Sequence, residues 1–227
     1  MSEWIERYEG PLMAAYVRGA LRGEGPLFDM PLEALTEEDY SRLLALGREA
    51  ELKLYDFKKK ERLPRVKKTL GFLRGVLPES LLDIGSGRGV FLFPFLMDFP
   101  EVPVTSVDLL EHRVAVLNAV AQGGIRRLTA LRQDITAWDM PRGAFDVVTA
   151  LEVLEHIPNV QAAIRSAVHL ARRYVVVTVP SKPDDNPEHI HLLTRERLTA
   201  MFGDARCARL HFDGVEGHLF MVATVGK

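Results

Sequence analysis

Leu81-Leu82-Asp83-Ile84-Gly85-Ser86-Gly87-Arg88-Gly89-Val90 is the stretch that decides the fold. Its apolar residues around one acid predict a buried strand, the alternating glycines predict a tight turn, and the apolar run that follows predicts the start of a helix. Glycine is needed at such a turn because the backbone bends sharply and a ligand approaches more closely than a Cβ would permit. A helix that begins there presents unpaired N–H groups and the positive end of its dipole. The stretch therefore predicts half of a nucleotide-type binding site.

Asp83 distinguishes between possible cofactors. Dinucleotide-binding turns place a small residue three positions after the second glycine, where this chain has Val90. A carboxylate two residues before the first glycine would repel a pyrophosphate, but it suits a ligand that carries an ammonium group and a sulfonium. We therefore expect a positively charged ligand rather than a dinucleotide.

The pattern of this stretch, in which an acid between apolar residues precedes Gly-x-Gly-x-Gly, resembles the first motif of class I S-adenosylmethionine-dependent methyltransferases. The resemblance extends over roughly residues 65–227. It implies an α/β fold with a Rossmann-like doubly wound sheet, mostly parallel, that ends in an antiparallel hairpin. It also implies S-adenosylmethionine as the cofactor. In this family an acid after the third strand commonly meets the adenine amino group, a role that the resemblance carries to Asp134, with Ile135 or its neighbour supplying an N–H.

The alternation of strands and helices after Ser80 is typical of a parallel sheet covered on both faces. The expected later strands are 102–107, 128–131, 145–150 and 174–179, and the expected closing hairpin is 205–212 with 218–225. Asp108 ends the second strand 23 residues after Gly85, near the ~20 expected for a carboxylate that binds ribose hydroxyls. The residues expected to bind the cofactor are Asp83, Gly85, Ser86, Gly87, Asp108, Leu109, Asp134, Ile135 and Leu151.

Residues 1–64 are expected to form a helical extension that acts as a lid over the acceptor pocket, and residues 65–227 to form the methyltransferase domain. Thr36 precedes three acids, which is typical of a helix N-cap. Apolar residues from Tyr40 to Phe57 are spaced as on one helical face, and Pro64 breaks that helix before a second one.

The candidate catalytic residues follow the fourth strand, in Leu151-Glu152-Val153-Leu154-Glu155-His156-Ile157-Pro158. This string resembles the post-strand motif of many small-molecule and RNA methyltransferases, including ubiquinone-type O-methyltransferases. Glu152, Glu155 and His156 lie on one side if the segment is helical. We expect His156 to act as the base or to position the acceptor.

An alternative assigns a metal to the same segment. Glu152, Glu155, His156 and a distant His189 resemble the divalent-metal ligands of small-RNA 3′-terminal ribose 2′-O-methyltransferases. The chain departs from that pattern at Leu193, where the family has an aromatic residue before the threonine. Related strings also occur in relatives that hold no metal, and we favour that interpretation. The spacing recommends none of the remaining histidines, His112, His169, His211 and His218.

Composition limits the other possibilities. The chain has 227 residues, of which 47% are hydrophobic, and a net charge of −2, so it is not a general polyanion binder. The single cysteine, Cys207, excludes an intrachain disulfide and a multi-cysteine metal site. Charges near the N-terminus disfavour a signal peptide, and no apolar run is long enough to span a membrane. We therefore expect a cytoplasmic protein.

One segment is strongly basic. Lys58 to Lys68 holds five lysines and two arginines against one glutamate, a net +6 in eleven residues. Such a run is usually a solvated helix face, and the alternative is a surface that attracts RNA or a phosphate-bearing substrate. The sequence thus predicts a methyltransferase with a small-molecule acceptor. The alternatives are an RNA methyltransferase and a non-catalytic nucleotide- or partner-binding module on the same fold.

Overall fold

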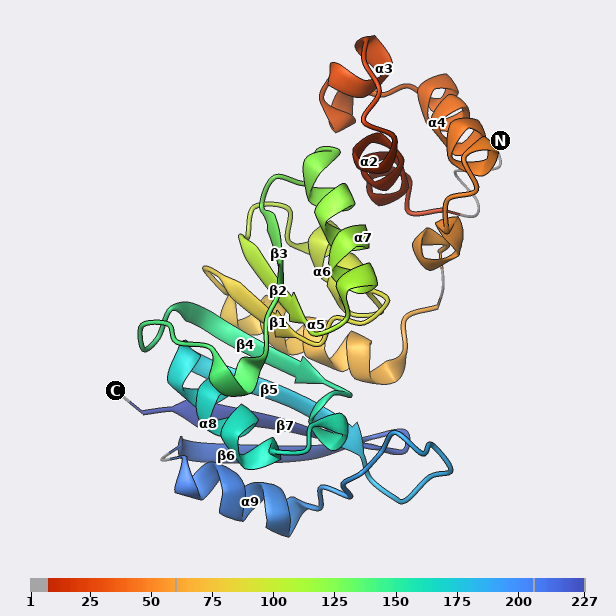
Figure 1. Cartoon of the computed structure of the whole chain (residues 1–227). Helices are drawn as coiled ribbons and strands as arrows, with labels where there is room; N and C mark the ends of the chain where they lie inside the picture. Colours follow the sequence, from red (N-terminus) through yellow and green to blue (C-terminus); the bar gives the residue numbers. More distant parts are fainter. Residues whose placement is uncertain (1–7, 60, 206, 227) are drawn as a thin grey trace.

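A computed structural model describes residues 8–59, 61–205 and 207–226 of the chain (Figure 1). Its centre is one seven-stranded sheet with the order β3-β2-β1-β4-β5-β7-β6. The strands are β1 (Leu81–Ile84), β2 (Val104–Asp108), β3 (Leu128–Arg132), β4 (Phe145–Leu151), β5 (Ala171–Pro180), β6 (Cys207–Val215) and β7 (His218–Val225). The first five pair in parallel, and β7 is antiparallel to both β5 and β6. The predicted doubly wound sheet with its closing hairpin is confirmed.

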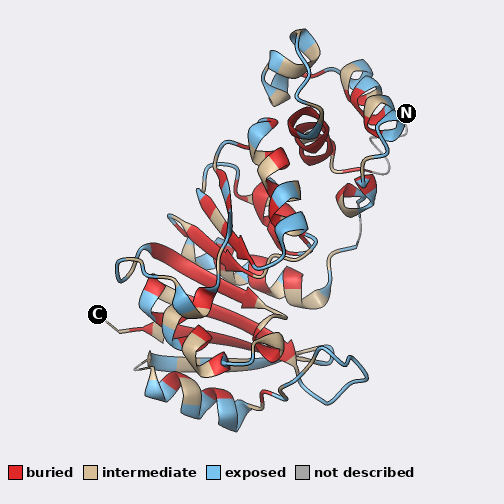
Figure 2. Cartoon of the chain, in the orientation of Figure 1, coloured by how far each residue is buried: buried red, intermediate tan, exposed pale blue. Residues whose placement is uncertain are grey.

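Helices cover both faces of this sheet. The longer ones after residue 60 are α5 (Pro64–Val76), α6 (Leu92–Asp98), α7 (Glu111–Gln122), α8 (Val160–Leu170) and α9 (Arg195–Asp204). Helices α5, α6 and α7 share one apolar core with strand residues such as Val147, while α8 and α9 share the other with Val148. Adjacent residues of a strand point to opposite faces, so a strand buried on both sides is apolar throughout. Figure 2 shows this burial along the central strands.

The N-terminal extension consists of short helical elements. They are α2 (Gly10–Leu21), α3 (Pro26–Asp29), η1 (Leu32–Ala34), α4 (Glu37–Glu49) and η2 (Leu54–Phe57). Thr36 caps α4 through a reciprocal capping box with Asp39, as predicted.

The predicted continuation of α4 to Phe57 is wrong. Helix α4 ends at Glu49, and Glu51 has a left-handed backbone with φ +54°. Leu54 and Phe57 are still buried, but on the separate turn η2, where Phe57 stacks between Tyr16 and Phe93. The spacing of the apolar residues therefore predicted correctly that Leu54 and Phe57 are buried. It did not predict that the chain leaves the helix after Glu49.

The extension packs beside α7 (Figure 1), where α2 and α7 meet backbone to backbone. A Cβ added to Gly19 would lie 1.9 Å from the carbonyl oxygen of Ala119, and one added to Gly123 would lie 1.7 Å from that of Ala15. Only glycine permits so close a contact at these two positions.

The structure also shows, among the described residues, no helix with the length and apolar character needed to cross a membrane. The cytoplasmic location stays a prediction.

Replacement of Gly123 by alanine tests the contact between α2 and α7. Gly123 has φ −82°, which alanine adopts readily, so the substitution adds only a methyl group. We expect a loss of about 2 kcal/mol in the free energy of unfolding, because the added atom forces the helices apart. Gly71→Ala is the control, since a Cβ there meets nothing within 4 Å in the interior of α5 and should stabilise by ~0.5–1 kcal/mol. Urea unfolding followed by circular dichroism measures both, and equal effects of the two substitutions would contradict the packing described here.

Candidate cofactor and acceptor site

A cavity of about 760 Å³ lies at the carboxyl ends of the parallel strands. Its walls come from the segments that follow β1, β2, β3 and β4, together with the start of α5. The strand order reverses direction at β1, which has β2 on one side and β4 on the other. Open α/β sheets bind ligands at such a reversal because the loops after adjacent strands diverge there. The cavity volume is in the range usual for small-molecule sites.

All nine residues predicted to bind the cofactor line this cavity. They are Asp83, Gly85, Ser86, Gly87, Asp108, Leu109, Asp134, Ile135 and Leu151. The fold thus brings together segments that are up to 68 positions apart in sequence. Their individual roles stay predictions.

The glycine turn after β1 requires its glycines. Gly85, Gly87 and Gly89 have φ values of +67°, +56° and +76°, the left-handed region that other residues avoid. A Cβ on Gly85 would lie 2.4 Å from the Val153 side chain, so the turn also packs tightly against the segment after β4. Helix α6 begins at Leu92, slightly later than predicted, and has seven residues.

Asp83 is buried at the base of the turn. One carboxylate oxygen accepts a hydrogen bond from Ser86 Oγ at 2.5 Å and the other from Thr149 Oγ1 at 2.7 Å. Burial raises the pKa of Asp83 to about 6, although both hydroxyl donors act in the opposite direction. Asp83 therefore shapes the turn as well as supplying negative charge to the cavity. The sequence analysis did not identify Thr149, which is an ordinary strand residue in sequence.

Two further acids lie at strand ends along the cavity. Asp108 accepts hydrogen bonds from the backbone N–H of Leu110 at 2.9 Å and of Gly87 at 3.3 Å, and so connects β2 to the glycine turn. Asp134 accepts from Thr136 N at 2.8 Å and caps the turn η3 (Ile135–Ala137). Both acids thus hold loops in place, and both line the cavity where the cofactor roles were predicted.

The candidate acceptor end of the cavity is lined by Glu152, Val153 and His156, the last of which belongs to η4 (Leu154–His156). Glu155 is fully buried, and neither of its carboxylate oxygens has a hydrogen-bond partner among the described residues. Burial, together with the nearby Glu152 carboxylate, raises its pKa to about 8. A buried acid without a partner is costly, so this position is a candidate functional site.

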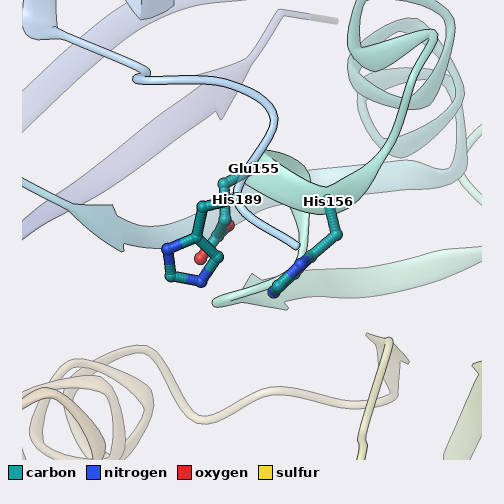
Figure 3. A group of neighbouring side chains, drawn as sticks. All are labelled: Glu155, His156 and His189. Atoms are coloured by element: carbon teal, nitrogen blue, oxygen red, sulfur yellow. The ribbon is translucent and has the colours of Figure 1, made fainter. Parts of the chain in front are cut away.

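His156, His189 and Glu155 form a compact group (Figure 3). One ligand atom from each lies within 4.8 Å of the others. The Nδ1 atom of His156 faces the Glu188 carbonyl at 2.9 Å, and that of His189 faces the Asp184 carboxylate at 2.8 Å. Because both partners are acceptors, each Nδ1 donates, and each neutral ring keeps a lone pair on Nε2. Histidine ligands of metals commonly have this arrangement, so the donor set fits a divalent ion.

The fourth residue of the predicted metal cluster, Glu152, lies outside this group. It does not share a helical face with the others, because it precedes η4 and has φ +55°. Its carboxylate contacts His218 Nε2 at 2.9 Å. Of the four residues of the alternative metal cluster, the structure brings Glu155, His156 and His189 together and leaves Glu152 apart. His218 belongs to the distant β7, and only the pairing of the hairpin with β5 brings it to Glu152. The position of His218 in the sequence therefore did not indicate that it contacts Glu152.

The N-terminal extension does not lie where a lid over the acceptor pocket was predicted. No described residue before Arg65 lines the cavity, and from α5 only Arg65 and Val66 reach it. The extension instead covers α7. The division of the chain at residue 64 stays a prediction.

Most described charges of the basic segment already have partners within the chain. Lys60 lies outside the described residues. The pairs are Arg62 with Asp98, Arg65 with Glu152, Lys67 with Glu61 and Lys68 with Asp213. The segment thus has less unpaired charge for a polyanion than its net +6 indicates.

Comparisons with known proteins place the chain in a family. The family described as "Methyltransferase domain" matches residues 52–215. The ubiquinone biosynthesis O-methyltransferase of Bordetella bronchiseptica is 32% identical over 113 residues, which are 49% of this chain and 44% of that protein. The enzyme of the same name from Idiomarina loihiensis is 35% identical over 103 residues, 43% of this chain and 41% of that one. The chain matches less than half the length of these curated relatives.

Solved structures share the fold at low sequence identity. The methyltransferase domain of bacterial CtHen1-C has a TM-score of 0.61 at 18% identity, over 72% of this chain and 98% of that one. Haemonchus contortus phosphoethanolamine N-methyltransferase 2, solved in complex with S-adenosyl-L-methionine, has a TM-score of 0.60 at 13% identity, over 71% of this chain and 53% of that one. These likenesses support the fold, and the match over most of the sequence decides the family: the chain belongs to the methyltransferase domain family.

Proposed function

We propose that this protein transfers the methyl group of S-adenosylmethionine to a hydroxyl oxygen of a small-molecule acceptor. The observation that carries the proposal is the arrangement of the cavity, with the glycine turn and Asp83 at one end and Glu152 and His156 at the other. Two curated relatives are named O-methyltransferases, and one solved neighbour holds the cofactor. The names of the curated relatives support the choice of an oxygen acceptor, and the solved neighbour supports only the choice of cofactor.

The cofactor half of the site offers complementary groups for each part of the ligand. The turn from Gly85 to Gly87 lets the ligand approach the backbone, and Asp108 offers a carboxylate to ribose hydroxyls. Leu109 is 59% exposed and provides an apolar surface beside it, while Asp134 lies at the place assigned to the adenine amino group by resemblance. When bound, S-adenosylmethionine supplies an electrophilic methyl carbon on a positively charged sulfur.

The acceptor half provides hydrogen-bond acceptors for a hydroxyl group. The Nδ1–H of His156 donates to the backbone carbonyl of Glu188, which fixes the ring and leaves the lone pair of Nε2 able to accept a hydrogen bond from a hydroxyl group. His156 thus offers the hydroxyl group of an acceptor a hydrogen-bond partner in a fixed orientation.

The pH dependence of cofactor binding tests the proposed role of Asp83. A bound cation favours the ionised carboxylate, whose pKa in the free protein is about 6. Affinity for S-adenosylmethionine should therefore rise with pH and be about tenfold higher at pH 7 than at pH 5. Calorimetric titrations at both pH values measure the ratio. Asp83→Asn should weaken binding and reduce this slope.

Two results would contradict this cofactor assignment. One is an affinity for S-adenosylmethionine that does not change with pH in the wild type. The other is tighter binding of NAD than of S-adenosylmethionine, because the acid beside the glycine turn should disfavour a pyrophosphate.

A second candidate function is metal-assisted methylation of a terminal ribose of RNA. The group of Glu155, His156 and His189 favours it, since it combines a carboxylate without partners and two imidazoles with free Nε2 atoms. A divalent ion held there would polarise a ribose hydroxyl. Most described basic side chains between Lys58 and Lys68 already pair with acids of the chain, which argues against a large RNA-binding surface.

Thermal unfolding with and without Mn²⁺ tests the metal group. If the group holds a metal, Mn²⁺ should raise the melting temperature of the wild type, because a ligand that binds only the folded state stabilises it. Glu155→Gln and His189→Asn should abolish the increase. Glu188→Gln is the matched control, since this side chain lies next to the group but outside it. An equal increase in all four proteins would assign the effect to a different site.

A further inference from the structure

Glu152 has an unusual backbone at the point where β4 ends. Its φ of +55° lies in the left-handed region, which a non-glycine residue adopts only at a cost in conformational energy. Its N–H donates to the carbonyl of Thr178 on β5 at 2.9 Å, so the sheet holds it in this conformation. The next residue, Val153, packs against the glycine turn at Gly85. The fold thus maintains a strained glutamate beside the cofactor turn.

Two distant elements hold the Glu152 side chain. Its Oε2 atom contacts His218 Nε2 at 2.9 Å, at the start of β7, and Arg65 Nε at 4.0 Å, in the first turn of α5. The other ring nitrogen of His218 faces the carbonyl of Glu216 at 2.9 Å, which fixes the orientation of the imidazole. Both contacts are made by Oε2.

The other carboxylate oxygen remains without a partner. Glu152 Oε1 is buried and has no hydrogen-bond partner among the described residues, although Glu152 lines the cavity. A buried acceptor of this kind is unfavourable unless a donor from a ligand reaches it. Glu155, His156 and His189 form their group without Glu152, so the metal alternative does not account for this oxygen.

We propose that Glu152 is the acceptor-side carboxylate of the site, with Arg65 and His218 as positioning residues. This inference rests on the proposed function and deepens it. Oε1 accepts a hydrogen bond from the hydroxyl group of the methyl acceptor. In the transfer the acceptor oxygen forms a bond to the methyl carbon, the methyl–sulfur bond breaks with its electron pair going to sulfur, and the hydroxyl proton passes to Oε1. His156 then orients the acceptor rather than taking its proton.

The acceptor class follows from this carboxylate. A neutral or cationic molecule whose methylated atom itself carries a hydrogen-bond donor satisfies Oε1, whereas an anionic group at the same place is repelled. The site therefore favours hydroxyl-bearing acceptors over carboxylates and phosphates at the reacting position.

Two cofactor analogues test the proposal without knowledge of the acceptor. S-adenosylhomocysteine lacks the methyl group, and sinefungin has a carbon in place of the sulfonium sulfur and an amine in place of the methyl group. In the wild type the amine should donate to Glu152 Oε1, so calorimetry should show about tenfold tighter binding of sinefungin than of S-adenosylhomocysteine. Glu152→Gln should reduce this preference to within about twofold and leave the affinity for S-adenosylhomocysteine within about threefold of the wild type.

Further variants separate this role from a structural one. Glu152→Gly removes the carboxylate and suits the positive φ, so it should fold and lose the same preference. His218→Gln and Arg65→Lys should lower the preference in part, because they loosen the carboxylate without removing it. Glu188→Gln, a second carboxylate of the cavity wall, is the matched control and should keep the preference of the wild type.

The outcomes distinguish this inference from the proposed function. If both analogues bind and the preference is the same in the wild type, Glu152→Gln and Glu152→Gly, Glu152 is not the acceptor-side carboxylate, and the cofactor assignment stands. If neither analogue binds the wild type, the proposed function is wrong and this inference with it. Loss of the preference in Glu188→Gln as well would assign it to the general charge of the cavity and would also overturn the inference.

Discussion

A single buried carboxyl group joins the central strands to the glycine turn. Asp83 on β1 accepts hydrogen bonds from Thr149 on β4 and from Ser86 in the turn, and the Ser86 hydroxyl lies 2.7 Å from that of Ser106 on β2. The three strands meet where the sheet changes direction, so the turn has a defined position over the cavity. The left-handed glycines then keep the path of the ligand clear.

Two buried acids lie in or next to the cavity wall, Asp83 on β1 and Glu155 beside His156 in η4, and burial raises the pKa of both. The pKa of Asp83 is about 6 and that of Glu155 about 8, in each case mainly because the surrounding atoms exclude water. Both acids would be stabilised in their ionised form by a cation. A positively charged cofactor at Asp83 agrees with this, whereas a cation at Glu155 belongs to the metal-dependent alternative.

The segment after β4 connects the two halves of the site. Val153 packs against Gly85, Glu152 turns toward Arg65 and His218, and Glu155 turns toward the two histidines in Figure 3. Neighbouring residues thus face different partners because the chain changes from an extended strand through a left-handed residue to a short turn. A regular helix would have placed the two glutamates on one face.

The sequence by itself determined the sheet, the glycine turn and the nine predicted cofactor-binding residues, all of which line the cavity. These features depend on local pattern, since strand apolarity, turn glycines and acids at strand ends are set by near neighbours in the chain. Only the tertiary structure decided the end of α4 at Glu49, the packing of the extension on α7 and the pairing of Glu152 with His218. Each of these features depends on segments that are far apart in sequence. Their contacts arise from the order of the strands and the packing of the helices, which the spacing of residues along the chain does not predict.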